Sequence, residues 1–308
     1  MRFSEKHLSY VLAVERAGSF TEAARQLFVS QPALSQVIRQ IEEELGLPLF
    51  DRKALPVRLT PAGEEYLRAA REVAAIENRL AGRAGEMKGE VRGSVTLGIS
   101  VQRGIRLLPE VMPAFLRKYP HLRVHLAEYG SDTLERMVLD GTCDFALITT
   151  DAASPRLRYR LVETEEILLI AARETALAAR VPDGGEITLK EAEEESFISL
   201  APGHSVRSVQ DQLFYTQGIR PRILIESHNI AACLRLTAAL NAVMLCPDVY
   251  LPGDADPDFR GRVRAYHLRE DFLQRHSCLC SLRERPWPAY MEDLYGLLCR
   301  ACGTRPEA

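Results

Sequence analysis

Residues 18–50 constrain the fold of this chain more than any other segment, because they predict two short helices joined by a tight corner. Ser19 is followed three residues later by Glu22, the capping-box spacing in which each side chain satisfies a free backbone N–H of the first turn. Ser30 can cap a second helix, and Pro32 fits the first turn of that helix, where no N–H donor is needed. A helix–turn–helix is therefore expected near the start of the chain.

The second predicted helix has one apolar face and one polar face. Apolar residues recur from Leu34 to Leu45 with steps of four, three and four, so they form a stripe that packs against neighbouring helices. Amide, hydroxyl and guanidinium groups on the opposite face are those with which a recognition helix contacts bases and phosphates in the major groove of DNA. A face that only meets water is the alternative, and the periodicity does not separate the two. The residues of this face, with the N-cap, are Ser30, Gln31, Pro32, Ser35, Gln36 and Arg39.

Two short strands are expected after Gly46, within residues 47–52 and 57–60, joined by a loop. Such a hairpin is a wing, and the positive charges of a wing can neutralise DNA phosphates. Residues 1–60 contain eight Lys and Arg against seven Asp and Glu, a net charge of +1, whereas the whole chain carries −3. The basic charge is local and modest, and it is the flanking wing that favours DNA binding over a merely solvated helix face. The cations of the wing are Arg52, Lys53 and Arg58.

Residues 19–52, followed by VRLTPAGE at 57–64, closely resemble the winged helix–turn–helix of the LysR-type transcriptional regulators. The resemblance implies that the start of the second helix faces the major groove and that the wing lies at the DNA backbone. Many members of the family carry arginine at the position of Gln36, so this chain is expected to have a base preference of its own there. The resemblance assigns Gln31, Pro32, Ser35 and Gln36 to the groove and Arg52 to the backbone.

The length and composition of the chain limit the classes of protein to which it can belong. A chain of 308 residues exceeds one typical core and predicts two or three domains. Apolar residues make up 46% and charged residues 26%, as in soluble globular proteins, and no apolar run approaches the ~20 residues that cross a bilayer. The seven cysteines lack the dense spacing of a disulfide scaffold, which favours a reducing cytoplasm.

A long helix is expected from residue 61 to about residue 88, with apolar residues at heptad spacing. A narrow apolar seam of this kind is best buried against a second copy of the same helix, so a dimer is expected. A helix that lies on its own domain is the alternative. In a dimer, two recognition helices related by a two-fold axis would read two half-sites about one turn of DNA apart. The seam consists of Tyr66, Val73, Ile76, Leu80 and Met87, and a hinge follows at residues 89–93.

From Ser94 onward, predicted strands and helices alternate, which indicates a parallel sheet with crossover helices. Ligands of such folds bind beyond the carboxyl ends of the strands, near helix N-termini whose free N–H groups favour anions. A side chain there can instead cap its own helix, and for any single hydroxyl this alternative stays open. The residues selected by this rule are Ser100, Val101, Gln102, Ser131, Thr149, Thr150, Pro202, His204 and His228.

This second half of the chain resembles the LysR substrate-binding domain, a relative of the periplasmic binding proteins, in LLP at 107–109, FLRKYP at 115–120 and LDGTCDFA at 139–146. The resemblance implies a winged helix–turn–helix rich in α-helix, a long linker helix, and a two-lobed α/β domain with an effector, often a small acid, between the lobes. It places the effector against Ser100, Gln102, Thr149, Pro202 and His204. The expected domains are residues 1–60, 61–90 and 91–308, with lobe I at about 91–162 and 267–308 and lobe II at about 163–266.

The resemblance implies a sequence-specific transcriptional regulator that responds to a small effector. The expected partners are double-stranded promoter DNA, the effector, further copies of the chain in a dimer or tetramer, and RNA polymerase as an additional candidate. The sequence contains no His-Glu-x-x-His, Walker or Gly-x-Ser-x-Gly motif, so no enzyme activity, metal or cofactor is expected.

Two alternatives to this interpretation remain. Cys278 and Cys280, together with Cys299 and Cys302, mimic the spacing of a zinc site or a redox pair, although ordinary buried residues explain them as well. A thiol-based redox sensor is therefore one alternative. A small-molecule carrier or enzyme built on the same lobes is the other.

Overall fold

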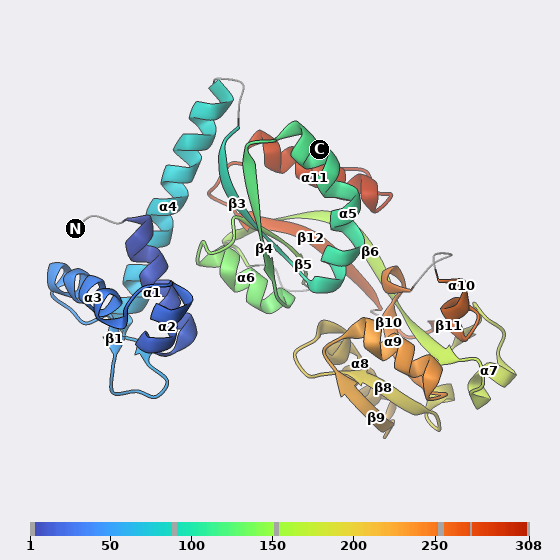
Figure 1. Cartoon of the computed structure of the whole chain (residues 1–308). Coiled ribbons are helices and arrows are strands. Elements are labelled where there is room, and N and C mark those ends of the chain that lie inside the picture. The colour runs from blue at the N-terminus through green and yellow to red at the C-terminus, as the bar shows by residue number, and fades with distance from the viewer. Residues whose placement is uncertain (1–3, 88–90, 151–153, 252–255, 272, 307–308) are drawn as a thin grey trace. The chain divides into compact units, whose positions relative to one another are not determined.

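The computed structural model describes residues 4–87, 91–150, 154–251, 256–271 and 273–306 (Figure 1). It forms two compact units, one comprising Met1–Val95, Tyr119–His125 and Asp140–Cys143, and the other the remainder of the chain. No helix among the described residues is long and apolar enough to span a membrane.

The chain begins with three short helices whose ends follow the predicted signals. Ser30 Oγ accepts a hydrogen bond from Ala33 N at 3.3 Å and so caps the third helix, which Gly46 ends with a φ of 72°. The capping box predicted at Ser19 is only half formed. Ser19 accepts from Glu22 N at 3.4 Å, but the Glu22 carboxylate binds Arg25 in its own helix. The helices are α1 (Glu5–Ala17), α2 (Phe20–Gln26) and α3 (Gln31–Leu45).

These helices share one small core with the wing and with the start of the next helix. Leu34, Ile38 and Ile41 of α3 are buried in it, as the spacing predicted. The wing pairs β1 (Phe50–Asp51) with β2 (Arg58–Leu59) in antiparallel register, and both strands are shorter than expected.

Helix α4 (Pro61–Met87) is the predicted long helix, but its heptad seam is not uniform. Tyr66 is 3% exposed because it packs into the core of the N-terminal helices with Leu67, so its assignment to a dimer seam is corrected. Ile76 and Leu80 are 54% and 69% exposed. Val73 is partly buried, whereas the side chain of Met87 and residues 88–90 of the predicted hinge lie outside the described residues.

The rest of the chain is built on one sheet of ten strands among the described residues, in which β4-β3-β5-β12-β6-β10-β8-β9 are neighbours. The expected parallel sheet is in fact mixed. Strands β3 and β5 are parallel, whereas β12 is antiparallel to β5 and to β6. The first group of elements, here called lobe I, comprises β3 (Gly93–Ile99), α5 (Val101–Lys118), β4 (Leu122–Glu128), α6 (Ser131–Leu139), β5 (Phe145–Thr149), β12 (Gln274–Leu282) and α11 (Ala289–Ala301).

The second group, here called lobe II, packs its helices on strands β8, β9 and β10 around an apolar core. Its elements are α7 (Ala176–Arg180), β7 (Glu186–Ile187), η1 (Leu189–Ala192), β8 (Ser196–Leu200), α8 (Ser205–Gln217), β9 (Arg222–Ser227), α9 (Ile230–Ala239), β10 (Val243–Pro247), η2 (Asp248–Tyr250), α10 (Pro257–Arg260) and β11 (Val263–Leu268).

A single long strand, β6 (Leu157–Ala172), belongs to both lobes. Its first part, through Glu166, pairs with β12, and its second part, from Ile167, pairs with β10. The sequence predicted that a new lobe begins near Glu163. No loop separates the lobes at that residue, because β6 is continuous there (Figure 1).

Candidate DNA-binding and effector sites

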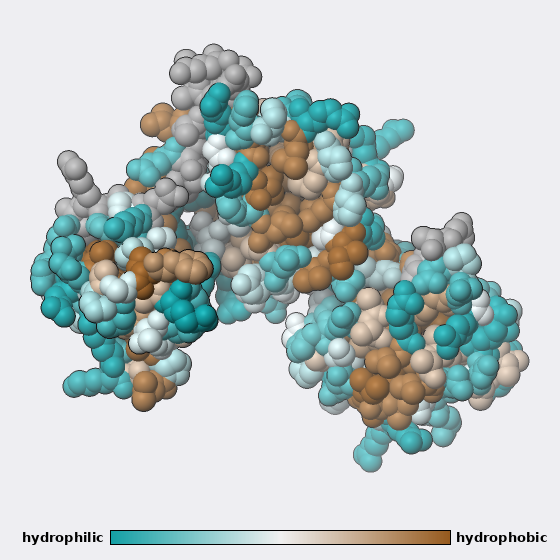
Figure 2. Space-filling view, in the orientation of Figure 1, coloured by the Kyte–Doolittle hydropathy of each residue, from teal (hydrophilic) through white to brown (hydrophobic). Residues whose placement is uncertain are grey.

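The polar face of α3 is displayed because the opposite face of the helix is buried. Gln31, Pro32, Gln36 and Arg39 are exposed and Ser35 is partly exposed, so the structure places these predicted side chains on one accessible surface. In the view of Figure 2 the surface over α3 is mostly hydrophilic. Amide and hydroxyl groups on such a surface can bond to base edges.

Two of these side chains are already held in place. Gln31 Nε2 donates a hydrogen bond to Ser35 Oγ at 2.9 Å, one helical turn away. Ser30 Oγ is engaged in capping, so the part of Ser30 in the site is to fix the start of α3 rather than to offer a free hydroxyl. The first two turns of α3 therefore present an ordered polar surface.

Arg52 ties the wing to the two helices of the motif. Its Nη2 lies 2.8 Å from Glu42 Oε2 on α3, and its guanidinium carbon lies 4.9 Å from the centre of the Phe20 ring. Glu42 Oε1 also accepts a hydrogen bond from Leu49 N at 2.9 Å. The sequence predicted that Arg52 contacts a DNA phosphate, but it did not predict these contacts within the domain. Lys53 and Arg58 are exposed on the wing.

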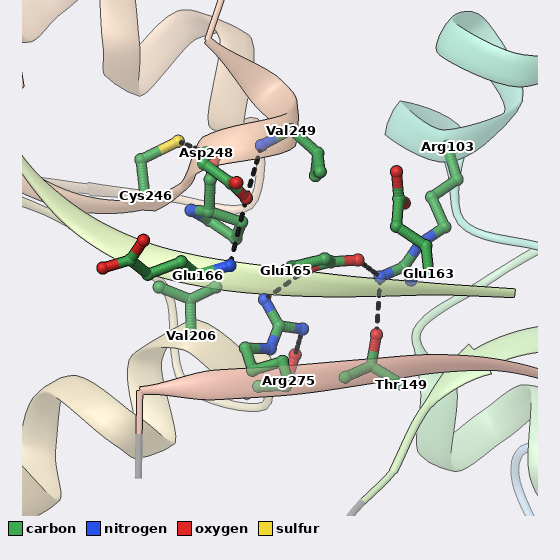
Figure 3. Close-up of polar contacts among 12 residues, drawn as sticks. Arg103, Thr149, Glu163, Glu165, Glu166, Val206, Cys246, Asp248, Val249 and Arg275 are labelled. Carbon is green, nitrogen blue, oxygen red and sulfur yellow. Dashed lines mark hydrogen bonds and ion pairs between the residues drawn. The ribbon is translucent and has the colours of Figure 1, made fainter. Parts of the chain in front are cut away.

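A second candidate site is a buried cluster of charges that involves β5, β6, β12 and α5. Arg103, Glu165 and Arg275 are 3%, 0% and 5% exposed. The Arg103 guanidinium is paired with the Glu165 carboxylate and donates a hydrogen bond to Thr149 Oγ1 at 2.6 Å (Figure 3). Arg275 Nη1 lies 3.4 Å from the second oxygen of Glu165. Two guanidinium groups thus flank one carboxylate.

The cluster reaches lobe II through two contacts. Arg275 Nη2 donates to Ser205 Oγ at 2.7 Å, at the start of α8. Tyr250 of η2 is hydrogen-bonded to Ser100, and burial raises the pKa of its hydroxyl, so it stays protonated. Asp248, which begins η2, accepts a hydrogen bond from Glu166 N at 3.1 Å and holds this turn against β6 (Figure 3).

Three of the predicted hydroxyls surround this cluster. Ser100 Oγ accepts from Arg103 N at 3.4 Å, and Ser131 Oγ accepts from Thr149 N at 3.0 Å. Thr149 Oγ1 accepts its hydrogen bond from Arg103, so all three hydroxyls are bonded within the protein. For Ser100 this bond is the helix cap that the alternative interpretation predicted. The strand-end rule therefore led to residues beside a buried charged cluster, and their contact with an effector stays a prediction.

His204 caps α8, and its Nδ1 accepts a hydrogen bond from Val206 N at 3.3 Å. Burial, followed by the charges of Arg275 and Arg103, lowers the pKa of His204 to about 4. The ring is therefore neutral at pH 7. The charge of His228 also contributes to this shift, although His228 itself is exposed. Of the other predicted residues, Val101 and Pro202 are exposed, and Gln102 and Thr150 are partly exposed.

Sequence reasoning missed Arg103, Glu165, Arg275 and Tyr250. Glu165 gave no clear signal, because in the sequence it stands between Thr164 and Glu166 and looks like part of a solvated polar run. Arg103 gave no signal either, since charged residues are common in the first turns of amphipathic helices. The nearby pair of Arg106 and Glu163, with two contacts between the side chains, was missed as well.

Several buried polar atoms of the cluster lack a hydrogen bond within the described part of the chain, among them one of Arg103 and one of Glu165. Arg103 Nε and Glu165 Oε2 are buried and make no hydrogen bond to the described residues. A buried polar atom without a partner costs about 1–3 kcal/mol. Such atoms in an otherwise well-bonded interior commonly mark a place where a ligand or water completes the bonding.

Cys246 and Cys302 offer little thiolate. All seven cysteines are free, and Cys143, Cys233, Cys246, Cys280 and Cys299 are buried. Burial and the neighbouring Glu163 raise the pKa of Cys302 to about 12, and burial raises that of Cys246 further. Reactive thiols have lowered pKa values instead. Within the described ranges, no three His, Cys, Asp or Glu residues are grouped so as to hold a metal ion.

A winged helix–turn–helix joined to an α/β domain of two lobes, with a buried polar site, defines a class of DNA-binding transcriptional regulators. Residues 6–64 match the bacterial regulatory helix-turn-helix proteins of the lysR family, and residues 88–303 match the LysR substrate binding domain. The chain belongs to the LysR family of transcriptional regulators.

Characterised and uncharacterised relatives agree with this assignment. The chain is 28% identical to the uncharacterized HTH-type transcriptional regulator YcgK of Bacillus subtilis, over 82% of each chain. It is 29% identical to HcaR, the hca operon transcriptional activator of Escherichia coli, over 79% of this chain and 81% of HcaR. The fold is similar to that of full-length CbnR in complex with its target DNA, with a TM-score of 0.62, 23% identity, and coverage of 98% of this chain and 100% of CbnR.

Proposed function

We propose that this chain regulates transcription by binding promoter DNA through α3 and the wing, and that a small molecule bound at the buried cluster alters this binding. The observation that carries the proposal is the ordered polar face of α3, which is exposed beside a basic wing on a family-typical scaffold. The proposed DNA contacts are Ser30, through its backbone, and Gln31, Pro32, Ser35, Gln36, Arg39, Arg52, Lys53 and Arg58.

The solved complex of CbnR with its target DNA supports this mode of binding, since that protein shares the fold over its whole length. Base edges would be read by Gln31, Ser35 and Gln36, while the cations of the wing neutralise phosphates. Arg39 extends the same face by one further turn.

We propose that α4 joins two copies of the chain. Ile76 and Leu80 carry exposed apolar side chains four residues apart, and such a face is stabilised by burial against a second helix. Val73 continues the same seam toward the N-terminal core. Two copies would place two recognition helices on one DNA site, which raises affinity without any new contact at either half-site.

The proposed effector site is the region of Ser100, Ser131, Thr149 and His204 around Arg103 and Arg275. Its polar groups come from both lobes, so a ligand that bound here more tightly in one arrangement of the lobes would shift the protein toward that arrangement. The other residues proposed to line it are Val101, Gln102, Thr150, Pro202 and His228.

Further parts of the proposal follow from this function. The domains are 1–60 for DNA binding, 61–90 for the linker, and 91–308 for the effector. The protein works in the cytoplasm, where promoter DNA is found, and it acts by binding rather than by catalysis.

A gel-shift titration tests the DNA-binding part. Purified full-length protein is titrated onto a fragment from upstream of its own gene and onto a random fragment of equal length, at 50 and 200 mM salt. Specific binding should survive the higher salt, because base contacts add to the phosphate contacts that salt weakens. Equal affinity for both fragments at both salt concentrations would contradict the proposal.

The effector part is tested with variants of the proposed site. Ser100→Ala and Thr149→Val should abolish the change in the gel shift caused by an effector found in a thermal-shift screen. Binding to DNA without effector should stay within about threefold of wild type. A full effector response in both variants would place the effector elsewhere.

A further inference from the structure

The loop of the wing, between β1 and β2, carries an exposed leucine. Leu55 is 93% exposed, whereas Val57 and Leu59, further along the wing, are partly buried against the core of the N-terminal helices. In Figure 1 this loop extends beyond α1, α2 and α3. Single exposed leucines are common on protein surfaces, so this one is informative only if the loop holds it in place.

Both arms of the loop are held by the helices of the domain. On one side, Arg52 is braced against α2 and α3. On the other side, Val57 N donates a hydrogen bond to Gly18 O at 2.9 Å. Pro56 approaches Gly18 so closely that a Cβ atom at Gly18 would lie 2.7 Å from Pro56 Cβ. Because the loop presents Leu55 at a fixed place, a partner could bury its side chain with little loss of backbone entropy.

The charges around Leu55 indicate which partner it fits. Arg52 is paired with Glu42, which leaves Lys53 and Arg58 against the single carboxylate of Asp51. Neither Lys53 nor Arg58 forms an ion pair with another described residue. The minor groove of DNA attracts such cations, and apolar side chains can enter it between two base pairs. An apolar tip between unpaired cations therefore fits the minor groove.

We propose that Leu55 is a wedge that the wing inserts into the minor groove, at a base step that unstacks easily. This inference rests on the DNA binding proposed above. Leucine has no hydrogen-bonding group in its side chain, so it cannot distinguish bases by the donors and acceptors on their edges. Burial of the side chain is favourable, and opening a base step is unfavourable by a comparable amount. Insertion should therefore succeed at flexible pyrimidine–purine steps such as TA and CA, and fail at stiff A-tracts.

Fluorescence tests whether the wedge opens a base step. Hydroxyl-radical footprinting of the full-length protein on its specific fragment first locates the step, as the place where wild type and Leu55→Ala differ. An adenine of this step is then replaced by 2-aminopurine, which becomes more fluorescent when it leaves the base stack. Wild type should raise the fluorescence, whereas Leu55→Ala should not. Leu55→Met keeps a long apolar side chain and should behave like wild type.

Affinities test whether Leu55 reads the flexibility of the step. Leu55→Ala should weaken binding to the specific fragment about tenfold, because most of a buried leucine is lost. Binding to random DNA depends on phosphate charges and should stay within about twofold of wild type. Replacing the flexible step by AA should weaken wild type about tenfold and the variant much less, since the two changes remove the same interaction.

Leu47→Ala is a matched control, because Leu47 is a 55% exposed leucine of the same domain that lies before β1. It should bind like wild type. The inference is overturned if Leu55→Ala binds the specific fragment like wild type, if wild type leaves the fluorescence unchanged, or if replacing the step weakens both proteins equally. A wild-type protein that bound specific and random fragments equally would instead refute the proposed function.

Discussion

Arg52 of the wing lies over the ring of Phe20, with its guanidinium carbon 4.9 Å from the ring centre, while its Nη2 is 2.8 Å from Glu42. The side chain that the family resemblance assigns to a phosphate is thus also a brace within the domain. It connects the wing with α2 and α3, which carry the candidate DNA-binding surface. Loss of Arg52 should therefore affect both stability and DNA binding.

We expect Arg52→Ala to lower the free energy of unfolding of the N-terminal core by about 1 kcal/mol, because a cation–π contact and a surface ion pair are each worth about that or less. Scanning calorimetry of the full chain measures the change. Arg58→Ala is the matched control, since it should weaken DNA binding and lower the salt dependence without shifting the unfolding transition. Equal unfolding temperatures for Arg52→Ala and wild type would contradict the bracing role.

Gln36→Ala should weaken specific DNA binding by about 1–3 kcal/mol, the usual cost of losing a good base contact. Ser35→Ala should weaken it as well, because it also releases Gln31, which donates to Ser35 Oγ. Gel-shift titrations on specific and random fragments give the difference. Ser9→Ala, an exposed serine on α1, is the control and should bind like wild type.

Leu80→Glu should convert the assembly toward monomers, because a charge in an apolar helix seam destabilises its burial against a second copy. Light scattering coupled to size-exclusion chromatography measures the mass at several concentrations. Glu77→Lys changes an exposed charge on the neighbouring face of the same helix and should leave the mass unchanged. A wild-type mass for Leu80→Glu would show that α4 does not use this seam.

His204 should make stability depend on pH below neutrality. Its pKa is about 4 in the folded protein and 6.5 as a free side chain, so the unfolded state takes up the proton first as the pH falls. The contribution of His204 to the free energy of unfolding is therefore fully present above about pH 6.5. It is lost as the pH falls from about 6.5 to 4, at about 1.4 kcal/mol per pH unit.

His204→Asn keeps a good helix cap and removes this titration. Between pH 7 and 5 the variant should lose about 1–2 kcal/mol less stability than wild type, as read from urea unfolding at each pH. Identical pH profiles for the two proteins would show that His204 is protonated in the fold as easily as in the unfolded chain.

Cys302 should react slowly with alkylating reagents in the native protein. A pKa of about 12 in place of 9.0 lowers the thiolate fraction at neutral pH about a thousandfold, and the thiolate is the nucleophile. Peptide mapping after iodoacetamide treatment, with and without urea, measures the rate. Labelling of Cys302 at the same rate in both conditions would favour the thiol-sensor alternative.

The local signals of the sequence predicted the DNA-binding half well. Ser30, Pro32 and Gly46 act within a few residues of chain, and they set α3 where expected. Tyr66 was misassigned for a long-range reason, because heptad spacing does not reveal that the first turns of α4 are buried in the domain before them.

The location of the effector site stays a prediction, and the charged residues beside it were not predicted from the sequence. Strand ends and helix starts pointed to Ser100, Thr149 and His204, since those features follow from local patterns. Glu165 and Arg275 meet through the pairing of β12 with β6, over more than a hundred residues of sequence, and Arg103 reaches Glu165 from α5. No periodicity carries that information.

The length of β6 has a consequence for how such a protein can be altered. Its sixteen residues supply backbone partners to β12 at one end and to β10 and β11 at the other. A recombinant that took one lobe from this chain and the other from a relative would have to splice inside a continuous ladder of hydrogen bonds. An exchange of one lobe should therefore disturb the backbone pairing of the other, whereas substitutions of side chains within a lobe leave this ladder intact.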